Sequence, residues 1–312
     1  MLKKLRIIAA LGLTALLSAC AGTPTAPTLA QLPPKLDNRK LLTDVPFFAQ
    51  DEYQCGPAAL AMMLNQRDIQ ATPEALKERV YIPERKGSLQ VEMIATARDN
   101  GLLVYPLEPD LAAVLSEVDA GNPVLVMQNL GLSWYPQWHY AVVVGYDLSE
   151  QQIILHSGLQ EAKREPMKLF LRTWQRANNW ARVTLPTNQL PATAIALPYL
   201  RAASDLEQTG KLNAAKEAYQ TALVEWPEEP AARLGLGNIA WSQGEQSVAI
   251  DHFSALTRQF PTFDAGWNNL VTGLTEMGCT RAAEIAKHCS EQRDQLNTEN
   301  DQNGTCPLPV CP

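Results

Sequence analysis

This chain contains few histidines and fewer basic than acidic side chains. Its 312 residues contain four histidines, and no Cys/His spacing resembles a zinc site, so we expect no metal centre and no cofactor. The 26 basic side chains face 33 acidic ones, and the formal charge of −7 argues against a nucleic-acid or anionic-membrane surface as a partner. The remaining composition, 46% hydrophobic and 19% charged, is that of a globular protein long enough for two domains.

No apolar run at the N-terminus is long enough to span a bilayer comfortably. Three cations precede an apolar run from Ile7 to Leu17, and "LSAC" then ends at Cys20. This order predicts a secretory signal over residues 1–19. "LSAC" resembles the lipobox of bacterial lipoproteins, whose cysteine becomes the lipidated N-terminus. The alternative is an ordinary signal peptide with an incidental cysteine.

Residues 20–42 are rich in Pro, Ala and Thr and predict a flexible tether from lipidated Cys20. Removal of the signal leaves 23 basic against 33 acidic side chains, a formal charge of −10. By resemblance to Gram-negative lipoproteins, the lack of Asp at position 21 points to the outer membrane, with the protein facing the periplasm. Membrane contact is then expected through the lipid alone.

Four further cysteines gather near the C-terminus, where an exported chain is expected to form disulfides. If residues 279–289 form one helix, its ends lie about 15 Å apart, too far for a direct bridge. Each helix cysteine is therefore expected to pair with a tail cysteine in residues 298–312. The four are Cys279, Cys289, Cys306 and Cys311.

A 34-residue repeat occupies the C-terminal third. Gly210, Gly244 and Gly278 keep this period, as do Tyr219 and Phe253. Glycine at a helix–helix turn with this spacing is the tetratricopeptide pattern, preferred here over an irregular helical bundle. We expect an all-α domain of three repeats, at 196–229, 230–263 and 264–297, after a linker at 187–195. Such repeats commonly present a concave face to a peptide or protein partner.

Residues 43–186 predict an α+β domain, with helices first and an antiparallel sheet second. Residues 43–50 read as extended, and helices are expected at 55–66, from the N-cap Thr72, from the N-cap Ser88 to 100–101, and from the N-cap Asp110 to about 121. Strands are expected at 123–128, 139–148, 151–157, 166–170 and 180–186.

Cys55 begins the apolar helix at 55–66 in the stretch "QDEYQCGPAALAMML". Unpaired N–H groups and the helix dipole favour a thiolate there, which predicts a lowered pKa and a nucleophile. Gly56 would let the backbone approach a substrate, and Pro57 suits the first turn. Gln50 could form an oxyanion hole with the Cys55 N–H. The alternative is a small buried residue.

A nucleophilic thiol needs a base, and His139 opens the apolar strand "HYAVVVGY". His252 and His288 lie in repeat helices and are expected to be surface or packing residues. The aromatic residues Trp134, Tyr135, Trp138 and Tyr140 surround His139 in sequence. They either line a substrate cleft or pack beneath a loop.

"QDEYQCGPAALAMML" together with "WHYAVVVGYD" resembles the C39-like cysteine peptidases, which have a papain-like fold. The resemblance covers residues 43–186 and implies Cys55 as nucleophile, His139 as base and Gln50 in the oxyanion hole. In that family an Asp on the next strand usually orients the histidine. Here that stretch reads "ILHSG". His156 is the preferred replacement, with Asp147 from a turn, or an unassisted Cys–His dyad, as alternatives.

These observations together predict a lipid-anchored thiol peptidase whose repeats recruit the substrate or a partner protein. Two other interpretations stay open. In the first, the peptidase-like domain is an inactive peptide clamp in an assembly lipoprotein. In the second, the same thiol chemistry serves acyl transfer or amide hydrolysis.

Overall fold

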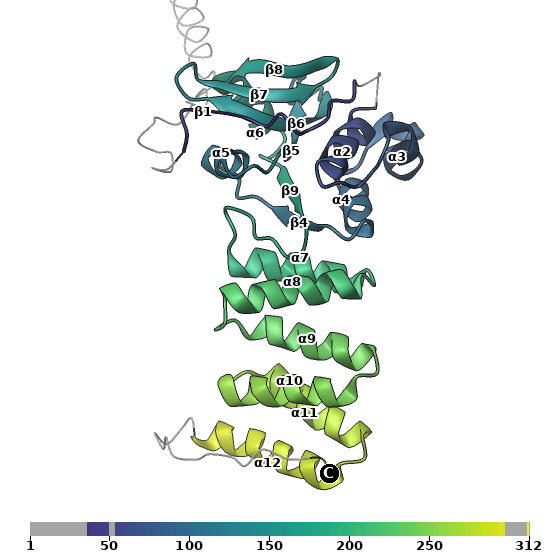
Figure 1. The fold of residues 1–312 in the computed structure, drawn as a ribbon, viewed down its shortest axis with the longest axis vertical. Helices are drawn as coiled ribbons and strands as arrows, with labels where there is room; N and C mark the ends of the chain where they lie inside the picture. Colours follow the sequence, from purple (N-terminus) through teal and green to yellow (C-terminus); the bar gives the residue numbers. More distant parts are fainter. Residues whose placement is uncertain (1–35, 50–53, 297–310, 312) are drawn as a thin grey trace, which may run out of the picture.

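The computed structural model describes residues 36–49, 54–296 and 311 (Figure 1). A sheet flanked by helices forms one end of the molecule, and a stack of helices extends from it along the long axis. The predicted signal peptide, Cys20, Gln50 and Cys306 lie outside the described residues. Among the helices of the described ranges, none has the length and apolarity that crossing a bilayer requires.

The sheet is antiparallel, with strand order β4-β9-β5-β6-β7-β8. Its centre is almost fully apolar and buried, as expected for strands covered on both faces. The strands are β4 (Leu103–Pro106), β5 (Val124–Asn129), β6 (Trp138–Asp147), β7 (Gln152–Ser157), β8 (Gln160–Pro166) and β9 (Ala181–Leu185). Two short strands, β2 (Tyr81–Ile82) and β3 (Gly87–Ser88), pair separately, with the 3-10 turn η2 (Pro83–Arg85) between them.

A further strand lies within the predicted tether. β1 (Arg39–Leu41) pairs with the far end of β6, where Leu41 faces Gly145. A Cβ atom at Gly145 would lie 2.5 Å from the Lys40 carbonyl oxygen, so only glycine permits this approach. The folded domain therefore begins before residue 43, and the predicted boundary at 42 is too late.

Four helices precede or interrupt the sheet: α2 (Cys55–Asn65), α3 (Pro73–Val80), α4 (Gln90–Asp99) and α5 (Leu111–Asp119). Thr72 and Asp110 accept hydrogen bonds from Ala75 N and Ala112 N, which confirms both predicted N-caps. Ser88 was wrong as a cap, because it lies in β3 and Leu89 occupies the N-cap position of α4.

The stretch at 166–170 was predicted as a strand, but Pro166 ends β8 and residues 167–170 begin α6 (Met167–Gln175). Met167, Phe170 and Trp174 recur at helical spacing and are all buried, so the apolar face fits a helix against the sheet. The strand that precedes it, β8, reads "QEAKREP", in which Glu161 and Arg164 are exposed, Lys163 is half-buried and Glu165 is buried.

The helical stack consists of α7 (Ala196–Gln208), α8 (Leu212–Glu225), α9 (Pro230–Ser242), α10 (Gln246–Gln259), α11 (Asp264–Glu276) and α12 (Thr280–Leu296). Successive helices follow one another along the long axis in Figure 1. Gly210, Gly244 and Gly278 have φ of 77°, 79° and 78°, the left-handed conformation that ends a helix before a tight turn. The 34-residue period therefore marks the turn within each helix pair, as predicted.

A disulfide joins Cys279 to Cys311, with the Cα atoms 5.6 Å apart. This confirms that Cys279 pairs with the tail and not within its own helix. Cys289 is disulfide-bonded as well.

Two apolar cores run through the described residues. The first includes the whole sheet domain and continues without a break into α7, α8 and α9, through residues such as Tyr199, Leu206 and Leu236. The second fills the space among α9, α10, α11 and α12. The first repeat is thus packed as part of the sheet domain.

The linker between the two parts is held by one buried carboxylate. Glu117 on α5 is fully buried and accepts hydrogen bonds from Ala192 N at 3.1 Å and Thr193 N at 2.8 Å. It also accepts from the Thr193 hydroxyl at 2.6 Å and from Asn122 Nδ2 at 2.8 Å. Because each donor is a linker or turn group, this carboxylate fixes the path of the chain into α7.

Candidate active site

Cys55 is the first residue of α2, as predicted, and the helix from Gly56 to Leu64 is buried on every side. No side chain caps this helix. Its thiol lies close enough to the backbone N–H of Tyr140 for a hydrogen bond, and to the N–H groups of Gly56 and Cys55 itself. Tyr140 directly follows His139 on β6, so the fold brings the thiol to the strand that carries the histidine.

The protonation state of Cys55 differs from the prediction. Burial raises the pKa of the Cys55 thiol, and the N–H groups of Tyr140, Gly56 and Cys55 lower it by less. The predicted lowering by the helix start is therefore outweighed, because removal of water disfavours the thiolate more than three N–H groups favour it. The resting residue is a thiol.

Gly56 has a packing role in place of the predicted approach to a substrate. A Cβ atom at this position would lie 2.2 Å from the Ser88 hydroxyl oxygen and 3.3 Å from Met93 Sδ. The absent side chain lets α2 lie directly against β3 and α4. The Tyr140 hydroxyl donates a hydrogen bond to the Ser88 carbonyl at 3.3 Å, which joins β6 to β3 at the same place.

His139 is half-buried at the start of β6, with its Nε2 atom 2.9 Å from the Ser157 hydroxyl. Ser157 ends β7, the neighbouring strand. Because this contact uses Nε2, Nδ1 is the nitrogen left for proton transfer, and it makes no hydrogen bond with the described residues. Among the residues that the structure describes, no hydrogen bond joins the His139 ring to the Cys55 thiol.

The environment of His139 favours its neutral form. Burial and the nearby charge of Lys163 lower the pKa of His139 to about 4. A serine hydroxyl carries no charge and so cannot offset these effects as a carboxylate would. The imidazole is therefore neutral at ordinary pH and can accept a proton.

The structure places neither His156 nor Asp147 against the His139 ring. His156 is 3% exposed, lies within 3.2 Å of the Val45 carbonyl through Nε2, and accepts from Ala162 N through Nδ1. Both of its nitrogens are thus occupied elsewhere. Asp147 lies at the other end of β6, where it accepts from the Ser149 hydroxyl at 2.7 Å.

A buried polar network beside His139 was absent from the sequence predictions. Gln128 is paired with His139 across β5 and β6, and it donates to the Thr173 hydroxyl at 2.7 Å. Glu165, also buried, pairs with Lys163 at 2.9 Å, so an acid holds the cation that lowers the pKa of His139. The polar pair Gln128-Asn129 at the end of the apolar run "VLVM" was the available signal in the sequence.

The aromatic residues around His139 divide into two groups. Trp134, Tyr135 and Trp138 are 80%, 66% and 54% exposed, so they do not pack beneath a loop. Tyr140 is buried and lies edge-on to Trp180, with ring centroids 5.8 Å apart. The exposed group leaves an apolar surface directly before the histidine.

The other candidate residues lie apart from this site. His252 and His288 lie on α10 and α12 of the repeats, as predicted. Gln50 falls outside the described residues, so its predicted oxyanion role is untested. Within the described ranges, no three His, Cys, Asp or Glu side chains gather in a group that could hold a metal ion.

Comparison with known families gives two matches along the chain. Residues 42–182 match the model described as "Peptidase_C39 like family", and residues 200–262 match a tetratricopeptide repeat model. A search of curated proteins gives no match.

Similar solved structures include a putative C39-like peptidase from Bacillus anthracis, at 17% identity and a TM-score of 0.41, covering 48% of this chain and 98% of that one. A double glycine motif protease from an AMS/PCAT transporter, in complex with its leader peptide, is 20% identical with a TM-score of 0.36, and the match covers 46% and 93%. The peptidase domain of Streptococcus ComA is 19% identical with a TM-score of 0.35, with 45% and 96% covered.

Proposed function

Since residues 42–182 form a C39-like peptidase domain and tetratricopeptide repeats follow it, we propose that this protein is a thiol peptidase that acts on peptide or protein substrates. The observation that carries the proposal is the convergence of Cys55 and His139 on one corner of the fold. The thiol lies at the N–H of the residue after His139, and the histidine is held through Nε2 by Ser157.

The protonation states favour general-base catalysis over a preformed ion pair. A neutral thiol and a neutral imidazole require that Nδ1 of His139 take the proton as Cys55 Sγ attacks the carbonyl carbon. The C–N bond then breaks, the same proton passes to the departing amine, and water hydrolyses the thioester. We propose that an N–H group at the start of α2 stabilises the oxyanion, with Gln50 as the second donor.

The proposal also includes the position of the enzyme in the cell envelope. We propose that Cys20 carries the lipid anchor, that the outer membrane holds the protein on its periplasmic side, and that the repeats recruit the substrate or a partner. The exposed apolar group of Trp134, Tyr135 and Trp138, next to His139, would contact the substrate near the scissile bond.

Covalent labelling tests this function. The full chain is incubated with a peptide-based electrophile, and adducts are located by mass spectrometry. We expect one adduct at Cys55 in the folded protein, none in Cys55→Ala, and loss of most labelling in His139→Ala, each with an unchanged circular dichroism spectrum. Labelling of Cys55 no faster in the folded protein than in the denatured chain would contradict a peptidase. Product analysis with peptide and with amide substrates separates peptide hydrolysis from acyl transfer.

A second candidate is a peptide clamp without turnover. It is favoured by the missing carboxylate at His139 and by the raised pKa of Cys55. A stable peptide complex that persists in Cys55→Ala, with no cleavage product from the wild type, would support the clamp.

A further inference from the structure

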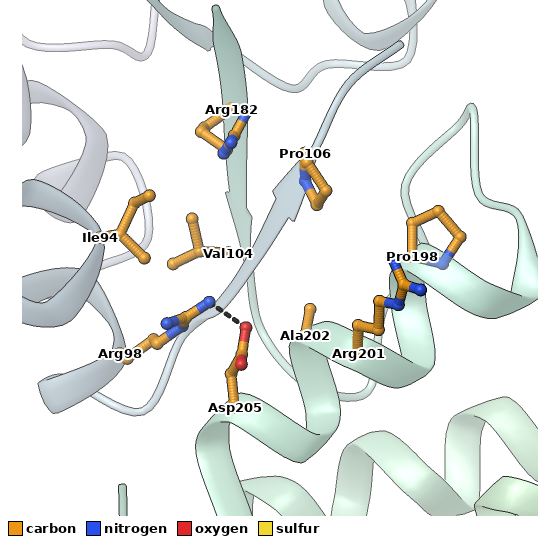
Figure 2. A pocket seen from close by; sticks show the side chains of 9 residues that line it. All are labelled: Ile94, Arg98, Val104, Pro106, Arg182, Pro198, Arg201, Ala202 and Asp205. Atoms are coloured by element: carbon orange, nitrogen blue, oxygen red, sulfur yellow. Dashed lines mark hydrogen bonds and ion pairs between the residues drawn. The ribbon is translucent and has the colours of Figure 1, made fainter. Parts of the chain in front are cut away.

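A cavity lies at the seam between the peptidase domain and the first repeat, away from Cys55. Its volume is about 260 Å³, and its walls come from α4, β4, β9 and α7. Figure 2 shows Arg98 reaching from α4 to Asp205 on α7, with Arg182 on the strand side and Arg201 further along α7. The seam belongs to the continuous first core, so these elements hold the cavity in a fixed shape.

Positive charge dominates the cavity. Three arginines line it, and Asp205 is the only carboxylate among the lining residues. Asp205 forms an ion pair with Arg98 through one terminal nitrogen, while Arg98 Nε is buried with no hydrogen-bond partner. Two arginines and one buried donor thus lack an acidic partner in the cavity wall, in a chain whose net charge is −7.

Arg182 has polar and aromatic contacts but no acidic partner among the lining residues. Its guanidinium lies 5.0 Å from the Trp180 ring centroid, and one nitrogen donates to the Ala181 carbonyl at 2.7 Å. Burial and the charge of Arg98 lower the pKa of Arg182 to about 10. A bound anion would relieve both the desolvation and the repulsion between Arg182 and Arg98.

The rest of the wall is apolar and includes Ile94, Val104, Pro106 and Pro198. Binding sites for drug-sized ligands have volumes of about 300–1,000 Å³, so this cavity suits a smaller group. Guanidinium groups match the two oxygens of a carboxylate, and the apolar wall suits a hydrocarbon group attached to it.

We propose that this cavity binds an organic carboxylate that bears an apolar group, with Arg182 and Arg201 contacting the carboxylate. A peptide C-terminus with an apolar last side chain and a free fatty acid share this chemistry. The site does not depend on Cys55, so it stands whether or not the chain is a peptidase. Occupancy would link a ligand to the junction between the catalytic domain and the repeats.

Isothermal titration of the full chain tests the site. The probes are N-acetyl-Ala-Leu with a free carboxylate, its amide, octanoate and inorganic phosphate. The variants are Arg182→Gln and Arg201→Gln. The matched control is Arg258→Gln, an exposed arginine on α10 outside the cavity. Thermal unfolding of each variant verifies the fold, and Arg201 is exposed on α7, so its loss leaves the core intact.

We expect saturable binding of at least one of the two carboxylates, about tenfold or more weaker in each cavity variant and unchanged in Arg258→Gln. Tighter binding of the dipeptide than of octanoate assigns the site to a peptide C-terminus, and the reverse assigns it to a fatty acid. The proposal is overturned if neither carboxylate binds, if the amide binds as well as the acid, if phosphate binds as tightly, or if both cavity variants bind like the wild type.

Discussion

At the scale of single residues, the decisive feature is that a neutral hydroxyl holds His139. Ser157 can fix the orientation of the ring, but it cannot stabilise a charged imidazolium. Burial keeps the Cys55 thiol neutral, and burial together with the nearby charge of Lys163 keeps the His139 imidazole neutral. A carboxylate at the same position would favour the ion pair and supply a more reactive thiolate.

Substitution of Ser157 tests this reasoning. Ser157→Asp is expected to raise the pKa of His139 and to increase the rate of Cys55 labelling at neutral pH by roughly tenfold, because the carboxylate favours imidazolium and thiolate together. Ser157→Ala removes the orienting contact and should slow labelling by roughly tenfold. Stopped-flow measurement of labelling gives both rates. Equal rates in all three proteins would show that Ser157 has no positioning role.

The dependence of labelling on pH gives a second test. In the proposed mechanism His139 accepts a proton only when it is unprotonated, and its pKa is lowered from 6.5 to about 4. Labelling should therefore persist through mildly acidic pH and be lost as the pH falls through about 4. A further rise is expected under alkaline conditions, where the buried Cys55 thiol ionises at a pKa above the ordinary value. An acid limb centred near pH 6.5 would contradict a buried, cation-facing histidine.

Sequence reasoning proposed Cys55 and His139 as the catalytic pair, which stays a prediction, and it named His156 where the structure places Ser157 against the His139 ring. Adjacent residues in a strand face opposite sides, so His156 and Ser157 cannot both face the ring. Which of them does so depends on register, and β7 has register shifts against both β6 and β8. Such bulges leave no periodic signal in a six-residue strand.

At the scale of elements, the helices and strands that were predicted correctly are those with a clear local pattern of apolar or capping residues. The α2 helix, the N-caps Thr72 and Asp110, and the buried strands β5, β6, β7 and β9 follow from apolar runs and capping chemistry. The strand β8 was not predicted, because "QEAKREP" at the edge of the sheet shows no alternation of apolar and polar residues. The start of α6 resembles a strand when only 166–170 are read, and its helical period needs Trp174 to become visible.

The buried Glu117 carboxylate that holds the linker gives a prediction at the scale of elements. Glu117→Ala should lower the free energy of unfolding by about 3 kcal/mol or more, since it leaves two backbone N–H groups and one hydroxyl of the linker without their acceptor. Denaturant titration of the full chain measures the change. Glu108→Ala, at an exposed glutamate of the same domain, is the control and should change it by less than about 0.5 kcal/mol. Equal effects of the two substitutions on the free energy of unfolding would contradict a stabilising role of Glu117 in the linker.

At the scale of the whole molecule, the two apolar cores define two units of stability. The first joins the peptidase domain to the first repeat, and the second holds the last three helices together with part of α9. The Cys279–Cys311 disulfide is attached to the second core, which includes both cysteines among its packed residues. Loss of this bridge should therefore affect one unit and spare the other.

Calorimetry of the Cys279→Ser/Cys311→Ser double variant tests this division. Closure of a 32-residue separation predicts a loss of about 3–4 kcal/mol from the second unit by the chain-entropy estimate. The transition of the second unit should move to lower temperature, while that of the peptidase unit and the rate of Cys55 labelling stay unchanged. A single transition that moves as a whole would contradict two separate units.

The continuous core between the sheet domain and α7 has a geometric consequence for the proposed peptidase. Because this packing and the Glu117 contacts fix the first repeat against the sheet domain, we expect a substrate anchored on that repeat to lie at a set distance from Cys55. The distance from the first repeat to Cys55 then determines how many substrate residues must separate the anchored segment from the scissile bond. Insertion or deletion of substrate residues between these two points should lower the rate of cleavage even when the sequence around the scissile bond is unaltered.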